Sequence, residues 1–138
     1  MLGTGPDAVC MRCHARGDDC DQARAGLLAN LARLDQAIKS ADQVLGLAER
    51  SGMEVSVARL GQDQARDSLT KARVTIHSFR TDLVDQDIQA GLKIAAKNLQ
   101  AGKAAMVERN RRRAGLVVSL LSIGMVLIGL WMYIKTES

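Results

Sequence analysis

The residues with the most definite chemistry lie near the start of the chain, in the sequence Cys10-Met11-Arg12-Cys13-His14. The spacing Cys-x-x-Cys-His is that of covalent c-type haem attachment. In such a site two thiols, one helical turn apart, add to the vinyl groups of a haem, and the adjacent imidazole binds the iron. The motif therefore predicts haem c held by Cys10, Cys13 and His14, with His14 as the proximal iron ligand.

Two other interpretations of these residues stay open. A zinc ion could use Cys10, Cys13, His14 and Cys20, but structural zinc sites usually draw their ligand pairs from two separated segments, and these four lie close together. The motif can also occur by coincidence, without any metal. Cys20 is then an inert thiol, or one that pairs with a cysteine elsewhere. Among the three interpretations the sequence favours haem.

A second axial ligand for the iron would have to come from elsewhere, and the candidates are Met53 and His77. A first helix of about 30 residues puts Met53 about 45 Å from the cysteines, which excludes it as a ligand within the chain. Counting back along an antiparallel second helix puts His77 level with Leu27, near the start of the first helix. His77 is therefore a possible distal iron ligand, although a histidine at the edge of a helical core fits the same pattern.

The C-terminal part of the chain has the composition of a membrane helix. Residues 114–134 include no acidic or basic side chain, and as a helix they reach about 30 Å, the thickness of the hydrocarbon layer. Arginines crowd the N-terminal side of this run, and Trp131, Tyr133 and Lys135 mark its other end, as expected at the two membrane surfaces. We name the arginines at 109, 111, 112 and 113 the arginine collar. The sequence predicts one transmembrane helix over 114–134, with a short tail at 135–138.

Small residues recur along this predicted span. Gly115, Ser122 and Gly129 are spaced seven residues apart and form one stripe, which would let a second helix approach closely. Helix–helix self-association is therefore a possible partner interaction within the membrane.

Three apolar stripes predict amphipathic helices between 21 and 113, because their residues follow alternating steps of three and four. The first stripe is Leu27, Leu31, Leu34, Ile38, Ala41, Leu45 and Ala48; the second is Ala65, Leu69, Ala72, Ile76, Phe79 and Leu83; the third is Ile88, Leu92, Ala95, Leu99, Gly102 and Met106. The only proline is Pro6, so nothing later in the chain interrupts a helix by lacking an N–H.

Two places along these stripes favour a turn. At the first, either Gly52 ends a helix in the left-handed conformation, or Ser51 and Glu54 form a capping box for the next helix. At the second, Thr81 or Asp82 could cap a new helix where the stripe slips in phase. The fold class is therefore all-α: a long antiparallel helical hairpin or a three-helix bundle, with a C-terminal single transmembrane helix. The similar lengths of the stripes favour three helices.

Composition excludes several functions. The chain has 138 residues with one Phe, one Trp and one Tyr, and a net charge of +4. No glycine-rich phosphate loop, nucleophile with a base, or pair of catalytic carboxylates is present, so we do not expect an enzyme acting alone. Outside the arginine collar the basic residues are spread along the helices, which argues against binding to nucleic acid.

The order of these segments resembles the C-terminal end of bacterial membrane-anchored multihaem c-type cytochromes. The resemblance covers the haem motif within 9–14 running into 17–21, a helical hairpin containing His77, and 111–116 opening a terminal span. It implies electron transfer through closely spaced haems with histidine at both axial positions, and partners that are other haem domains or redox proteins. Because only one Cys-x-x-Cys-His and no export signal are present, 1–20 is expected to be the end of a larger haem domain, in a truncated product.

Two predictions about the membrane conflict with each other. Haem of this type is attached outside the cytoplasmic (inner) membrane, so the soluble part of a single-pass protein would lie on the outer, periplasmic side. The arginine collar before the span would instead keep it in the cytoplasm. We favour the haem motif, since a large exported domain is stopped by a span regardless of charge. The alternative is a cytoplasmic tail-anchored helical scaffold or coiled-coil interaction protein without haem. Its arginine collar would rest on anionic lipids, and its stripes would recruit a partner helix.

Overall fold

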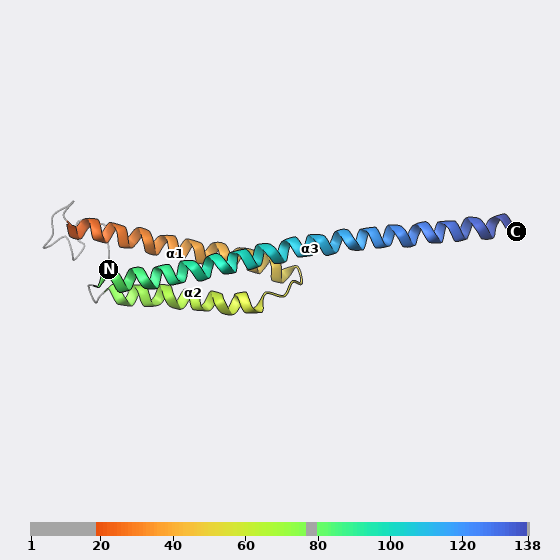
Figure 1. Cartoon of the computed structure of the whole chain (residues 1–138). Helices are drawn as coiled ribbons and strands as arrows, with labels where there is room; N and C mark the ends of the chain where they lie inside the picture. The colour runs from red at the N-terminus through yellow and green to blue at the C-terminus, as the bar shows by residue number, and fades with distance from the viewer. Residues whose placement is uncertain (1–18, 77–79, 138) are drawn as a thin grey trace.

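The computed structural model describes residues 19–76 and 80–137, and every element in these two ranges is a helix. In chain order they are α1 (Asp19–Arg50), α2 (Ser56–Thr75) and α3 (Thr81–Glu137). The three helices pack side by side in antiparallel order, and α3 continues far beyond the other two (Figure 1). This confirms the all-α fold class, with three helices rather than a single helix from the turn into the membrane.

The bundle has two distinct ends. We call the end with the α1–α2 turn, where α3 leaves the bundle, the membrane end. The other, where α1 begins, α2 ends and α3 begins, is the far end (Figure 1). α1 begins at Asp19, two residues before the expected domain boundary of 21, so the expected haem segment 1–20 overlaps the helix.

α1 packs through the first apolar stripe. Leu34, Ala41, Leu45 and Ala48 have no exposed surface and Ile38 is only 4% exposed, because alternating steps of three and four keep these side chains on one face. Leu27 and Leu31 are partly buried towards the far end. The first stripe was therefore predicted correctly.

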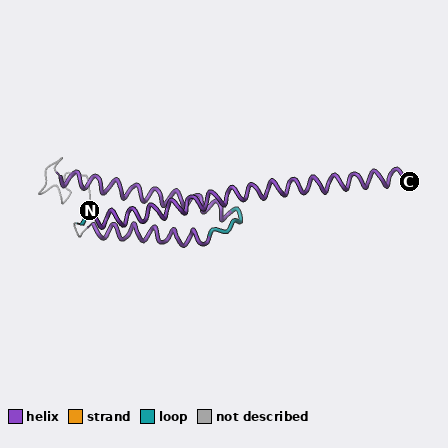
Figure 2. Tube along the Cα trace, viewed as in Figure 1, coloured by secondary structure: helices purple, strands orange, loops and turns teal. Residues whose placement is uncertain are grey.

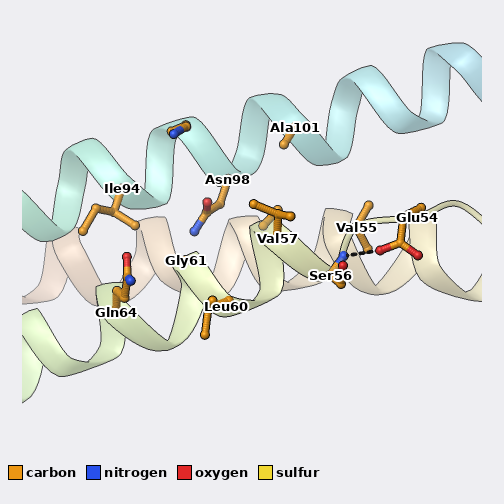
Figure 3. Close-up of a pocket in the computed structure, with 12 residues that line it drawn as sticks. Glu54, Val55, Ser56, Val57, Leu60, Gly61, Gln64, Ile94, Asn98 and Ala101 are labelled. Atoms are coloured by element: carbon orange, nitrogen blue, oxygen red, sulfur yellow. Dashed lines mark hydrogen bonds between the residues drawn. The ribbon is translucent and has the colours of Figure 1, made fainter.

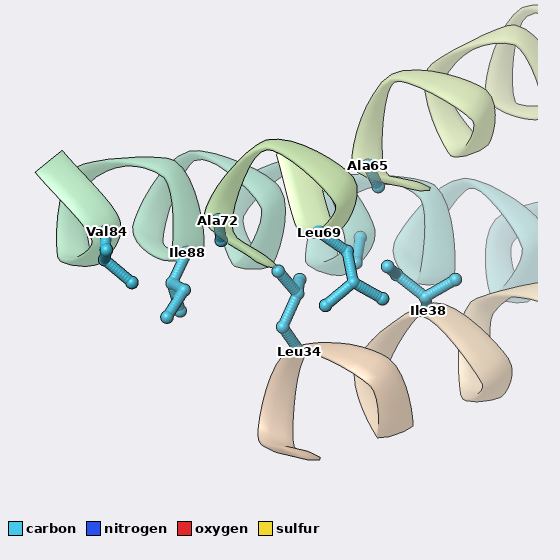
Figure 4. Close-up of a cluster of buried hydrophobic side chains, with 8 residues drawn as sticks. Leu34, Ile38, Ala65, Leu69, Ala72, Val84 and Ile88 are labelled. Atoms are coloured by element: carbon cyan, nitrogen blue, oxygen red, sulfur yellow. The ribbon is translucent and has the colours of Figure 1, made fainter. Parts of the chain in front are cut away.

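The main core is a single cluster shared by all three helices. Leu34 and Ile38 of α1 point towards Leu69 of α2, and Val84 and Ile88 of α3 extend the cluster (Figure 4). Its other members are small alanines, which let the helices approach closely: Ala65, Ala72 and Ala95. A second cluster fills the membrane end and consists of Leu45, Ala48, Val55 and Ala58.

The α1–α2 turn is closed by Gly52, whose φ of 76° is the left-handed conformation that glycine adopts without steric cost. The Met53 N–H donates to the Ala48 carbonyl and the Gly52 N–H to the Glu49 carbonyl, which is the Schellman arrangement of a helix end. The loop that follows is short (Figure 2). Of the two predictions for this turn, the glycine C-cap is confirmed.

The capping-box prediction for Ser51 and Glu54 is wrong, because α2 begins only at Ser56. Glu54 still satisfies a free N–H of that helix start, since its carboxylate accepts a hydrogen bond from the Ser56 N–H at 2.9 Å. This hydrogen bonding with Ser56 lowers the pKa of Glu54.

The second stripe is shorter than predicted. α2 ends at Thr75 and α3 begins at Thr81, the position expected for a new helix, so Leu83 belongs to α3 and not to the stripe of α2. Phe79 lies outside the described residues. On α3 the buried residue is Val84, at 1% exposure, because it stands four positions before Ile88 and shares its face, whereas Leu83 lies one position off it.

α3 is one continuous helix of 57 residues, about 85 Å long. It contains the only stretch in the described ranges that is long and apolar enough to cross a membrane, and none of that stretch is buried against the bundle. The Ser119 and Ser122 hydroxyls donate to the carbonyls of Gly115 and Val118, so these two polar side chains bond within the helix, as is needed in a bilayer. The predicted C-terminal membrane helix is therefore part of a helix that begins in the bundle.

Candidate functional site

The predicted haem ligands fall outside the described residues. Cys10, Cys13 and His14 precede the first described range, and His77 falls between the two ranges. The structure places none of the four, so whether they come together remains a prediction. The geometry of the described residues around them is informative nevertheless.

The far end of the bundle limits where the haem motif can lie. Cys13 is six residues before Asp19, where α1 begins, and an extended chain spans at most about 3.5 Å per residue, hence about 20 Å. α1 has 32 residues and is about 48 Å long. Because about 20 Å is less than half the length of α1, we expect the motif to lie nearer the far end than the membrane end.

The described residues on either side of His77, the end of α2 and the start of α3, lie at the same end. Ile76, the residue before it, packs against the core cluster that also contacts Leu27 and Leu31 near the start of α1. By contrast, Met53 packs against the second cluster, at the membrane end. The exclusion of Met53 as a ligand within the chain therefore agrees with the fold, and His77 is still a candidate.

At the far end, one polar contact joins α2 to α3 and another lies at the start of α3. The Thr75 hydroxyl lies 3.4 Å from an Asp87 carboxylate oxygen, and the Arg80 guanidinium donates to Asp82 at 2.9 Å. The hydrogen bond from Arg80 lowers the pKa of Asp82, and the same contact raises the pKa of Arg80. Both groups are thus held in their charged forms beside the segment that contains His77.

Within 19–76 and 80–137 no group of three or more His, Cys, Asp or Glu side chains is placed to hold a metal ion. Three of the four zinc ligands considered, Cys10, Cys13 and His14, lie outside these ranges. The zinc interpretation is consequently as untested as the haem interpretation.

A groove between α2 and α3 lies towards the membrane end and has a volume of about 420 Å³. Asn98 of α3 projects towards Gly61 of α2 (Figure 3), and a Cβ added to this glycine would lie only 2.8 Å from the Asn98 amide oxygen. Val57 and Leu60 on its rim are 85% and 64% exposed. The groove is therefore an apolar surface with an amide at its base.

The amide at its base is part of a buried chain of hydrogen bonds that joins all three helices. Asn98 Nδ2 donates to Gln62 Oε1 at 3.0 Å, and Gln62 Nε2 donates to the Ile38 carbonyl at 2.6 Å. Gln62 and Asn98 are only 1% and 4% exposed. Because buried amides are stable only when they are paired, this contact favours one register of the three helices.

Ion pairs join α1 to α2 along the surface. Asp42 accepts hydrogen bonds from Arg66 at 2.7 Å and from Arg59 at 3.4 Å, and Arg59 also pairs with Glu49 at 2.7 Å. The hydrogen bond with Asp42 raises the pKa of Arg66. These contacts are partly exposed, so they contribute more to helix alignment than to stability.

At the membrane end, the arginine collar meets the α1–α2 turn. Arg109 Nη1 donates to the Ser51 hydroxyl at 3.0 Å, which joins α3 to the turn just before it leaves the bundle. Arg112 pairs with Glu108 at 2.8 Å, and this hydrogen bond lowers the pKa of Glu108.

The sequence patterns missed several core residues. Gly91 and Asn98 are buried, while Leu92 and Leu99 of the predicted third stripe are only partly so. The spacing alone would have allowed both sets. A pattern of apolar residues does not select Asn98, because an asparagine is usually exposed. Gln62, four residues after Ala58 and three before Ala65, was missed for the same reason.

No protein-family model, curated protein or solved structure matches this chain.

Proposed function

We propose that the chain is a membrane-anchored c-type cytochrome fragment, which carries electrons through a covalently bound haem. The observation that carries the proposal is the sequence Cys10-Met11-Arg12-Cys13-His14. Its donor set fits haem c, with two thiols for thioether bonds and one imidazole for the iron. When bound, the haem supplies reversible one-electron oxidation and reduction.

The fold is compatible with a membrane anchor at one end of the molecule and a haem at the other. The membrane helix belongs to α3, and α1 runs about 48 Å from the membrane end to the far end. We infer that the haem motif lies near the far end, because Cys13 is only six residues before Asp19, where α1 begins. The bundle would then hold the haem away from the membrane surface. The electron partner is therefore another haem domain or a redox protein that reaches the far end. Any enzymatic activity would belong to the complex.

The proposal is tested by expressing the chain behind an export signal, together with haem-ligation machinery, and staining a denaturing gel for haem. We expect a haem-positive band in the parent chain. Cys13→Ala should lose most of the stain, because a thioether bond and its local geometry are removed. Cys20→Ala is the matched control and should retain it, because Cys20 lies outside the motif. A colourless parent band despite correct export would contradict the proposal.

The distal ligand is proposed to be His77. Its position next to Ile76, which packs against the core at the far end, is the supporting observation. The test compares the absorption and EPR spectra of the haem-loaded parent chain with those of His77→Ala. The expected result is loss of a low-spin bis-histidine signal, and an unchanged signal would exclude this assignment.

The proposed location is the cytoplasmic membrane, with the chain crossing once and the bundle on the outer side. Haem attachment supports this orientation, whereas the arginine collar opposes it. Val57 offers a labelling site because it is 85% exposed. The test uses Val57→Cys with Cys20→Ala in whole cells whose outer membrane has been permeabilised. A maleimide that cannot cross the cytoplasmic membrane should label this chain. Labelling only after the cytoplasmic membrane is opened would contradict the orientation.

The alternative function is a helical scaffold without haem. Its original form, in which the apolar stripes recruit a partner helix, loses support because these stripes pack against one another within the bundle. The observation that still favours a scaffold is the groove between α2 and α3, with Val57 and Leu60 exposed on its rim. The haem stain separates the two functions, since a scaffold of this kind leaves the band colourless.

A further inference from the structure

The membrane end of the bundle concentrates positive charge at one depth. The arginine collar occupies 109–113 of α3, which is an axial rise of only about 6 Å. The headgroup region on each side of a bilayer is about 5–7 Å thick. The length of the collar along the helix axis therefore matches the thickness of one headgroup layer.

The depth of the collar is fixed by the helix. α3 has no break between the collar and the residues that follow from 114 onwards, so insertion of the apolar part sets the height of every arginine. Arg109 in addition contacts Ser51 of the α1–α2 turn, which holds the bundle against the collar. The arginines consequently cannot move far from the membrane surface while the helix is inserted.

The collar arginines differ in their contacts. Arg109 is engaged with Ser51 and Asn110, and Arg112 with Glu108. Within the described ranges, Arg111 and Arg113 make no ion pair, and both are exposed. Two residues apart on a helix means about 160° around the axis, so these two guanidinium groups project on opposite sides of α3.

The carboxylates at this end are already engaged. Glu49 pairs with Arg59, Glu108 pairs with Arg112, and Glu54 accepts the Ser56 N–H. None of them is bonded to Arg111 or Arg113 in the described part of the chain. Glu108 and Arg111 interact only through their charges, without a direct contact, so both guanidinium groups can bind anions from outside the bundle.

We propose that Arg111 and Arg113 bind the phosphates of anionic phospholipids, one on each side of α3, and so form a lipid-binding collar at the foot of the bundle. A guanidinium group presents paired N–H donors that match phosphate oxygens. The acyl chains of these lipids lie beside the apolar residues from 114 onwards, so one lipid contacts both parts of the helix. This inference does not depend on haem.

The test uses the full chain in phosphatidylcholine bilayers that contain a small amount of either spin-labelled phosphatidylglycerol or spin-labelled phosphatidylcholine. EPR measures the fraction of each labelled lipid that is motionally restricted by the protein. A juxtamembrane basic residue contributes about 1 kcal/mol, or about fivefold in affinity. We expect the parent chain to prefer phosphatidylglycerol several-fold, and Arg111→Gln with Arg113→Gln to reduce that preference to near unity.

The matched control removes the same charge from the far end of the bundle. Lys71 and Arg73 are exposed in the last turns of α2, so Lys71→Gln with Arg73→Gln should keep the full preference. The proposal is overturned by an equal association of both lipids with the parent chain, or by an equal loss of preference in the control. Inorganic phosphate, added at constant ionic strength, distinguishes the sources. Selective release of phosphatidylglycerol by phosphate would show a site for the free anion and would also overturn the proposal.

Discussion

α3 has two halves with different surroundings. The bundle half, which precedes the arginine collar, packs against α1 and α2, whereas the C-terminal half, from 114 onwards, is not buried against the bundle. In the bundle half, Val84, Ile88 and Ala95 are almost completely buried, and polar residues cover the other face. In the C-terminal half, apolar side chains occupy every face, and those of Leu121, Val126 and Ile128 are more than 60% exposed. The helix itself does not change between the halves.

The comparison shows that the pattern of apolar residues, and not the helical conformation, determines whether each half packs in a bundle or lies in a bilayer. A single stripe is satisfied by two neighbouring helices, so the bundle half needs α1 and α2. An apolar surface on all sides has no partner within the chain and requires the hydrocarbon of a bilayer. The arginine collar marks the change from one pattern to the other.

The largest effect is expected in the core of the bundle half. Leu45 has no exposed surface and Leu47, on the same helix, is 48% exposed. Leu45→Ala should lower the free energy of unfolding by about 2–5 kcal/mol, because it leaves a cavity. Leu47→Ala should change it by about 0.5 kcal/mol or less. Urea unfolding followed by circular dichroism in detergent micelles measures both, and equal losses would contradict the described packing.

The next effect tests the apolar half. Ile123→Arg, near the middle of 114–134, should raise the apparent free energy of membrane insertion by about 3 kcal/mol. Val107→Arg is the control, because Val107 is 68% exposed on the same helix but lies before the collar. A glycosylation-mapping assay of insertion measures the difference. If both substitutions had the same effect, the helix would not change its solvent at the collar.

A smaller effect concerns the buried amides that join the bundle half to α1 and α2. Gln62→Leu removes the acceptor for Asn98, so it should cost about 1–3 kcal/mol by leaving a buried donor unpaired. Adding Asn98→Leu should recover part of that loss, because no unpaired amide remains. A double-mutant cycle by urea unfolding gives the coupling, and strictly additive losses would show that the two amides do not interact.

The two glycines Gly52 and Gly26 should respond to alanine in opposite directions. Gly52 has φ 76°, whereas Gly26 is helical with no atom within 4 Å of an added Cβ. Gly52→Ala should destabilise the bundle by about 1–2 kcal/mol, and Gly26→Ala should stabilise it by about 0.5–1 kcal/mol. Unfolding midpoints in urea measure both changes. A stabilising Gly52→Ala would mean that the α1–α2 turn does not have the described conformation.

The smallest effect is a dependence on pH. Hydrogen bonding with Ser56 lowers the pKa of Glu54 from its ordinary value of 4.5. A carboxylate whose pKa is lowered by folding stabilises the fold above the unfolded pKa, and this contribution disappears as the pH falls through the folded pKa. As the pH is lowered below 4.5, the unfolding temperature should therefore fall less steeply in Glu54→Gln than in the parent chain. Identical pH profiles would contradict a role for Glu54 at the start of α2.

Much of this fold follows from local patterns in the sequence. The first stripe predicts the buried face of α1 from Leu34 to Ala48, and Gly52 predicts the turn, because each depends only on residues a few positions apart. The charge-free run likewise predicts the membrane helix. These features depend on little beyond helix geometry.

The rest depends on contacts between helices, which no local pattern contains. The choice of Val84 over Leu83, and of Gly91 and Asn98 over their leucine neighbours, is decided by what α1 and α2 present to α3. A buried Gln62 is stable only because it bonds to the Ile38 carbonyl and accepts from Asn98. The candidate haem site is still a prediction from sequence, because its ligands lie outside the described residues.

The account is tested most directly by peptide mass spectrometry of the exported chain after coexpression with haem-ligation machinery. We predict that the peptide containing Cys10 and Cys13 carries the mass of one haem, while Cys20 is modified by an alkylating reagent. If both sulfurs of the motif were alkylated instead, the chain would be a helical bundle on a membrane helix and not an electron carrier.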